Sequence, residues 1–159
     1  ISLAERLTQI APKGLSRCFY ADNGSSAVEV ALKMSVHYWR NQGQPQKTRF
    51  ITLQNSYHGE TLGALGVGDV GLYRETYDAL LLTPIRVMSP DAYPRSDGET
   101  AKDVALRAIA AMKKALDTHG HEVAAVIIEP LVQCAGGMRM YPSALLAEMA
   151  AICRRRADG

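Results

Sequence analysis

The sequence predicts an α/β fold in which a mostly parallel sheet is flanked by helices. Short apolar runs alternate along the chain with longer segments of helical periodicity. The run at 123–128 (VAAVII) contains no polar residue, which is typical of a strand that is buried on both faces, as in parallel sheets. The length of 159 residues suits a single domain with a hydrophobic core.

The N-terminal part of the chain predicts one strand and one helix. We expect the strand at residues 17–21 and the helix at residues 25–42. Ser26 and Glu29 have the spacing of a capping box, which places the start of this helix at Ser25 or Ser26.

The middle of the chain is less regular. We expect a strand at residues 50–53, followed by a polar loop. Residues 63–71 contain four glycines and predict a loop or a frayed helix. Two short apolar pieces at 80–82 and 85–88 are separated by a proline.

The C-terminal part has the clearest periodicity. Residues 100–118 predict a helix with one apolar face and one charged face. The strand at 123–128 follows it, and a last helix begins at Ser143, which we expect to cap it, and continues to residue 156.

Composition and charge exclude several classes of function. The net charge of +2 gives no reason to expect nucleic acid or an anionic membrane as a partner. No apolar run approaches the roughly 18 residues that a membrane span needs. The sequence contains three scattered cysteines, Cys18, Cys134 and Cys153. Their number and spacing do not indicate a disulfide framework, so we expect a cytoplasmic protein.

Polar and glycine-rich segments follow three of the predicted strands. These segments are residues 22–26, 55–60 and 129–137. Because ligands of open α/β sheets bind at the carboxyl ends of the strands, we expect a binding site where the three segments meet.

The first of these segments is suited to a phosphate. Gly24 and Ser25 lie at the start of a predicted helix, where free N–H groups and the helix dipole favour an anion. The alternative is that the serines only cap the helix. The common glycine-rich fingerprints of nucleotide-binding loops are absent.

The other two segments hold titratable groups. Tyr57, His58 and Glu60 could supply an aromatic surface and proton-transfer groups, or they could form an ordinary loop with a buried tyrosine. Glu129 ends a buried strand and needs a partner there; its role is either structural or catalytic.

Two further features favour the plainer interpretation. His119 and His121 have no third ligand nearby in the sequence, so we expect a solvated turn and no metal site. Cys134 has no identifiable base to activate it, so we expect an unreactive thiol.

Three motifs together resemble one enzyme family. DNGSSAVEVALKM at 22–34, YHGET at 57–61 and IIEPLVQCAGGMRMY at 127–141 resemble the class III aminotransferases, which are fold-type I enzymes that use pyridoxal 5′-phosphate (PLP). The resemblance implies that the chain is part of the large domain of such a transferase.

The resemblance also implies which residues contact the cofactor. Gly24 and Ser25 match the pair that holds its phosphate, and Tyr57 matches the aromatic residue that stacks on its ring. His58 completes that loop, and Glu129, together with Gln133, lies on the strand end beneath the cofactor.

The implied substrate contacts are fewer. Tyr57 borders the substrate in the family, and Glu60 stands near it, where one group of members has aspartate. That group transfers an amino group from S-adenosylmethionine to 8-amino-7-oxononanoate in biotin biosynthesis. It is favoured by Ala135, because several relatives acting on ω-amino groups carry glutamate at this position. Another class III ω-amino acid aminotransferase is the alternative.

Comparison with the family suggests a partial domain. We expect residues 1–159 to be a piece of the large domain that is truncated at both ends and open to self-association along the apolar strand at 123–128. None of the six lysines matches the family lysine that binds the cofactor covalently: Lys13, Lys33, Lys47, Lys102, Lys113 and Lys114. We therefore assign no catalytic residue and expect no turnover by this chain alone. A non-catalytic stand-alone domain is a further alternative.

Overall fold

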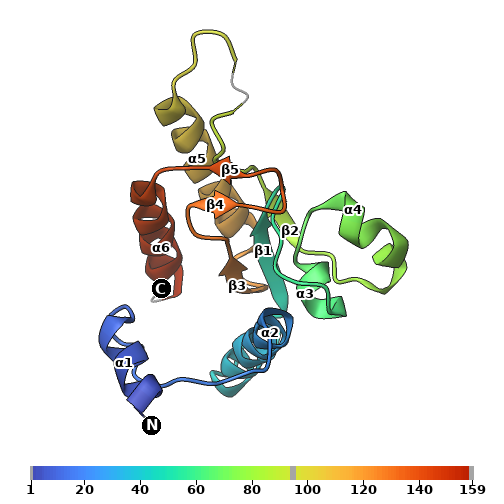
Figure 1. Cartoon of the computed structure of the whole chain (residues 1–159), viewed down its shortest axis with the longest axis vertical. Coiled ribbons are helices and arrows are strands. Elements are labelled where there is room, and N and C mark those ends of the chain that lie inside the picture. Colours follow the sequence, from blue (N-terminus) through green and yellow to red (C-terminus); the bar gives the residue numbers. More distant parts are fainter. Residues whose placement is uncertain (1, 94–95, 158–159) are drawn as a thin grey trace.

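The centre of the molecule is a parallel three-stranded sheet. The computed structural model describes residues 2–93 and 96–157. Strands β1 (Arg49–Leu53), β2 (Ile85–Val87) and β3 (Val123–Ile127) are arranged in the order β2-β1-β3, and both pairings are parallel (Figure 1). The predicted α/β architecture with a parallel sheet is therefore confirmed.

The strand predicted at residues 17–21 is wrong. Residues 17–21 form no strand within the part of the chain that the structure describes, and they connect α1 (Ser2–Ile10) to α2 (Gly24–Asn41). Phe19 and Tyr20 are 67% and 57% exposed. An apolar run becomes a strand only where a neighbouring strand offers hydrogen bonds and packing, and here β2 takes the position beside β1.

Helices pack on both faces of the sheet. The face with Ile51 and Leu53 packs against α5 (Ala101–His119) and α6 (Ser143–Ala157). The opposite face, with Phe50, packs against α2. These three long helices occur close to where the sequence predicts them.

The ends of the long helices differ in detail from the predictions. Helix α5 has a complete capping box between Thr100 and Asp103. Helix α6 begins with Ser143 as its first helical residue, so this serine lies inside the first turn and does not precede it.

Short elements surround the strand ends. The glycine-rich segment forms α3 (Leu62–Gly66) and leads to α4 (Gly71–Arg74) and a 3₁₀ helix, η1 (Glu75–Leu80). Strands β4 and β5 form a two-stranded antiparallel hairpin that the sequence did not predict: Val132–Gln133 and Arg139–Met140.

Strand β3 lies at one edge of the described sheet. Val123 and Ala124 are only 6% and 8% exposed, so the expected exposed apolar edge is wrong for these two side chains. The indole N–H of Trp39 donates to the carbonyl of Ala124 at 2.7 Å, so α2 reaches this edge.

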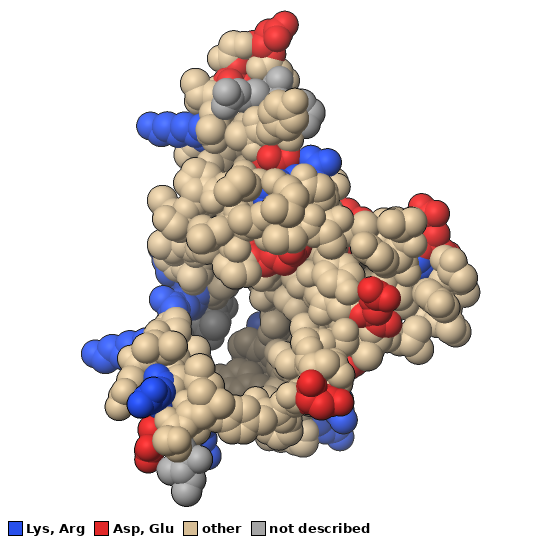
Figure 2. All heavy atoms as spheres, in the orientation of Figure 1, with Lys and Arg blue, Asp and Glu red and all other residues tan. Residues whose placement is uncertain are grey.

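Helix α1 stands apart from the rest of the molecule (Figures 1 and 2). None of its residues is buried. In the space-filling view, acidic and basic side chains are both distributed over the visible face (Figure 2). No helix within the described residues is long and apolar enough to span a membrane.

Candidate functional site

The three polar segments predicted at strand ends lie together. The backbone N–H of Glu60 donates to the hydroxyl of Ser25 at 3.1 Å, which joins the loop after β1 to the start of α2. The backbone N–H of Tyr57 donates to Glu129 Oε1 at 2.8 Å, which joins the same loop to the end of β3. The carboxyl edge of the sheet therefore carries one continuous polar site.

The start of α2 is capped by a different residue from the one predicted. Asn23 Oδ1 accepts from the N–H of Ser26 at 2.8 Å, and the Asn23 carbonyl accepts from Ala27 at 3.1 Å. The Ser26–Glu29 capping box is therefore wrong, because the short asparagine side chain already occupies the N-cap position.

Two N–H groups remain available at this helix start. Among the described residues, the backbone N–H groups of Gly24 and Ser25 have no hydrogen-bond acceptor. Apart from its chain neighbours and the backbone of α2, no atom of the described residues lies within 4 Å of the place that a Cβ on Gly24 would occupy. The positive end of the helix dipole is thus open to an approaching anion.

The Ser25 hydroxyl is held in place by the loop after β1. It accepts the N–H of Glu60, so its own proton is left for a second partner. Gly59 packs directly on Ser25: a Cβ at position 59 would lie 2.4 Å from Ser25 Oγ, and its φ of +128° favours glycine. Glycine at position 59 therefore allows the close contact.

Tyr57 is fixed at both its backbone and its side chain. Its hydroxyl donates to Glu60 Oε1 at 2.9 Å, and its ring centre lies 5.3 Å from that of Tyr73, with the ring planes at 60°. The hydrogen bond to Glu60, followed by burial, raises the pKa of Tyr57. Tyr73 in α4 was not predicted, because no local pattern shows which aromatic residue packs on the loop.

The sequence left a structural and a catalytic role open for Glu129, and the structure shows hydrogen bonds that fit the structural role. Its carboxylate accepts from the N–H groups of Tyr57 and Cys134, at 2.8 and 3.3 Å. Burial raises its pKa, and the two amide hydrogen bonds oppose that shift. Tyr141 donates its hydroxyl to the Glu129 carbonyl, and burial raises the pKa of Tyr141 to about 12.

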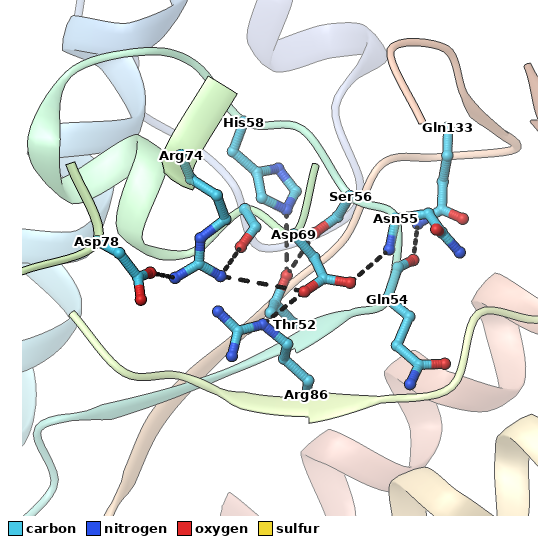
Figure 3. A network of polar contacts seen from close by, with 11 residues as sticks. Thr52, Gln54, Asn55, Ser56, His58, Asp69, Arg74, Asp78, Arg86 and Gln133 are labelled. Atoms are coloured by element: carbon cyan, nitrogen blue, oxygen red, sulfur yellow. Dashed lines mark hydrogen bonds and ion pairs between the residues drawn. The ribbon is translucent and has the colours of Figure 1, made fainter. Parts of the chain in front are cut away.

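His58 points into the interior beneath the loop (Figure 3). Its Nε2 lies 3.4 Å from Thr52 Oγ1, which is itself 2.9 Å from the buried hydroxyl of Ser56. Burial lowers the pKa of His58 to about 4. The imidazole is therefore neutral at neutral pH.

An acidic residue, Asp69, also supports this loop. Asp69 Oδ2 accepts the N–H of Asn55 at 2.9 Å, and Asn55 has a φ of +62°. Asp69 Oδ1 lies 2.6 Å from Arg86 Nε, an ion pair without the angle of a hydrogen bond, and Arg74 lies at 4.0 Å (Figure 3). The sequence did not predict these residues, which lie on separate elements.

Gln133 connects the loop to the hairpin. Its side chain is fully buried, accepts from the Ser89 hydroxyl at 2.6 Å and donates to the Gln54 carbonyl at 2.8 Å. The family resemblance placed Gln133 beside Glu129, and its observed contacts fix the end of β1.

The remaining candidate residues lie elsewhere or face solvent. His119 Nδ1 lies 2.8 Å from Glu122 Oε1 at the end of α5, and His121 is exposed. Cys134 has an exposed side chain in the hairpin turn. The described residues contain no group of three or more potential metal ligands.

Comparison with known proteins gives the family. A sequence model of the class III aminotransferases matches residues 1–157. Curated relatives from Geobacter sulfurreducens and Helicobacter pylori, both named adenosylmethionine-8-amino-7-oxononanoate aminotransferase, are 41% and 45% identical. Each match covers 98% of this chain and 34% of the relative, so the chain spans about a third of their length.

Solved structures of transaminases have the same fold. An omega transaminase from Pseudomonas jessenii, in complex with PMP, has a TM-score of 0.88 and 28% identity over 98% of this chain and 35% of its own. An adenosylmethionine-8-amino-7-oxononanoate aminotransferase from Methanocaldococcus jannaschii has a TM-score of 0.83 and 30% identity, over 98% and 33%. With the family match over residues 1–157, the chain belongs to the class III aminotransferases.

Proposed function

We propose that the site at the carboxyl edge of the sheet binds pyridoxal 5′-phosphate. The observation that carries this proposal is the open start of α2, where two N–H groups without an acceptor among the described residues lie beside a hydroxyl that is fixed by the Glu60 amide. This donor set fits a phosphate group. The aromatic ring of Tyr57 on the adjoining loop fits the flat face of a pyridine.

Each residue has a distinct proposed role. Gly24 and Ser25 would hold the phosphate, and Tyr57 would hold the ring. Glu129 would fix the backbone of Tyr57 through the hydrogen bond at 2.8 Å, and the neutral His58 would support the loop from beneath. PLP, when bound, supplies the electron sink that amino-group transfer requires.

The substrate would meet the same loop from the solvent side. Glu60 is exposed and accepts the Tyr57 hydroxyl, so its carboxylate orients that phenol. We propose that Tyr57 and Glu60 together border the substrate.

For the whole protein we propose amino-group transfer from S-adenosylmethionine to 8-amino-7-oxononanoate. The named relatives from two bacteria support this activity. Residues 1–159 would then be part of the PLP-binding large domain. We further propose that the protein acts as a homodimer in the cytoplasm; the scattered free cysteines agree with that location.

A class III enzyme for ω-amino acids is the second candidate, because the omega transaminase structure superposes with a TM-score of 0.88. Ala135 separates the two. Ala135 is exposed in the turn between β4 and β5. The family resemblance implies a glutamate at this position in several relatives that act on ω-amino groups. Assay of the whole protein with S-adenosylmethionine and with an ω-amino acid as donors distinguishes these activities.

Binding of PLP is tested by a pair of serine variants. Ser25→Ala removes the fixed hydroxyl, and Ser26→Ala, one residue along α2, serves as the matched control. We expect Ser25→Ala to weaken PLP binding in equilibrium dialysis by about fivefold, the value of one hydrogen bond, and Ser26→Ala to bind like the wild type. Equal affinities for all three proteins would contradict the assignment of Ser25.

A further inference from the structure

Glu29 reaches from α2 to the start of the next helix. Its Oε1 accepts from the backbone N–H of Gly63 at 2.7 Å and of Ala64 at 3.2 Å. These are N–H groups of the first turn of α3, which have no acceptor within that helix. Glu29 therefore caps α3 and does not cap its own helix.

The contact is close and specific. A Cβ at position 63 would lie 2.4 Å from Glu29 Oε2 and 2.7 Å from Oε1, so only glycine lets the carboxylate approach the backbone here. Both hydrogen bonds are partly buried. Water therefore competes less for these two amides than it would at an exposed helix end.

Ser25 and Glu29 act on one segment from one face of α2. They are four residues apart, so their side chains lie one turn apart on the same side of the helix. Ser25 accepts the N–H of Glu60, and Glu29 accepts those of Gly63 and Ala64. Helix α2 thus holds residues 60–64 through hydrogen bonds at two successive side chains, Ser25 and Glu29.

The same segment is held at its other end by Glu129. That carboxylate accepts the N–H of Tyr57 from the side of β3. The loop that carries Tyr57 and Glu60 is therefore fixed between two carboxylates on two different elements. Without the Glu29 contact, the bond at 3.1 Å would be the one remaining hydrogen bond, among the described residues, between α2 and residues 60–64; the other contacts with α2 are the packing of Gly59 on Ser25 and of Val67 in the apolar cluster with Leu32.

We propose that Glu29 is a positioning residue for the phosphate site at the start of α2. By holding α3, it places the N–H of Glu60 on the Ser25 hydroxyl and so directs that hydroxyl's proton toward the bound anion. The inference rests on the proposed PLP function for its ligand, whereas the contact between Glu60 and Ser25 can be followed without any ligand.

The experiment compares Glu29→Ala with Glu29→Gln in the full chain. Glutamine keeps an oxygen that accepts from the two amides, and alanine removes it. Lys33→Ala, one turn further along α2 and exposed, serves as the control for a substitution on this helix. Two readouts are used: hydrogen exchange of the Glu60 amide without ligand, and the affinity for PLP and for inorganic phosphate.

We expect Glu29→Ala to speed exchange of the Glu60 amide and to weaken binding of both ligands by about fivefold, comparable with loss of one hydrogen bond. Glu29→Gln and Lys33→Ala should match the wild type in both readouts. Restoration by glutamine separates positioning from a general loss of stability.

Three results would overturn the proposal. Unchanged Glu60 exchange in Glu29→Ala would show that Glu29 does not hold the loop. Equal losses in the alanine and glutamine variants would assign the effect to charge. Wild-type affinity in Glu29→Ala would remove Glu29 from the site. If the wild type itself binds neither ligand, the PLP proposal and the ligand role of Glu29 both fail, while Glu60 exchange still decides the positioning role.

Discussion

Gly59 controls how closely the loop after β1 approaches the start of α2. Gly59→Ala would place a methyl group 2.4 Å from Ser25 Oγ at a φ of +128°. Gly14→Ala is the matched control, because Gly14 has a φ of +100° and no described atom beyond its chain neighbours lies within 4 Å of its Cβ position. We expect backbone strain alone to cost each variant at least about 1 kcal/mol of stability, measured by urea unfolding.

Only Gly59→Ala should also displace Ser25 and weaken phosphate binding. A phosphate titration of the two variants separates the contact from the strain. If Gly14→Ala weakened binding as much as Gly59→Ala, the close contact would not be the cause.

His58 makes the stability of the chain depend on pH. Its folded-state pKa of about 4 lies below the ordinary value of 6.5, so between these pH values the unfolded chain binds more protons than the folded chain. The stability that the neutral imidazole contributes is therefore complete above about pH 6.5 and is lost as the pH falls toward 4.

The measurement compares the free energy of unfolding of the wild type and His58→Gln at about pH 7 and about pH 5. We expect the wild type to lose up to about 2 kcal/mol more than the variant over this interval. Because the carboxylates titrate in both proteins, the difference between them isolates the histidine. Parallel pH profiles would contradict burial of His58.

At the scale of elements, the two longest helices offer a matched pair of N-caps. Asn23 caps α2 and Thr100 caps α5, each through a side-chain oxygen that accepts from the backbone three residues on. Asn23→Ala and Thr100→Ala should each cost about 1 kcal/mol of stability by thermal or urea unfolding.

The two caps should differ in their effect on ligand binding. Only Asn23→Ala should weaken binding of PLP, because only α2 begins at the proposed phosphate site. A loss of affinity in Thr100→Ala of the same size would show that binding responds to stability in general.

The sequence predicted the three long helices well, because a helix depends mainly on residues that are close together in the chain. The apolar face of residues 100–118 is contained in the sequence of that segment, and α5 forms there. Pairing of strands depends on distant residues. The segment at 17–21 therefore looked like a strand, and the hairpin of β4 and β5 was not visible.

In the candidate site, too, features set by nearby residues could be predicted, and contacts between distant residues could not. Gly24, Ser25, Tyr57 and Glu129 could be singled out because each follows a strand or begins a helix, and their segments do meet. Which atoms pair could not be predicted. Glu29, for example, fits a capping box in the sequence but caps α3 in the structure, because Asn23 already caps α2.

At the scale of the whole molecule, two separate apolar clusters place the site. One cluster joins the sheet to α5 and α6, and the other joins it to α2. Helix α2 therefore has a fixed position relative to β1 and β3, and the loops that leave these strands converge on its start. A stable sheet is thus the condition for the proposed phosphate site.

The most direct test of the proposed phosphate site at the start of α2 is a phosphate titration of the chain, followed through its backbone amide resonances. We expect saturable shifts at Gly24, Ser25 and Glu60, because the first two N–H groups have no acceptor among the described residues and the third is hydrogen-bonded to the Ser25 hydroxyl. The first turn of α5, an equally capped helix start without these neighbours, should not shift. Absence of shifts at Gly24, Ser25 and Glu60 at high phosphate, or equal shifts at the start of α5, would contradict a phosphate site built by this fold.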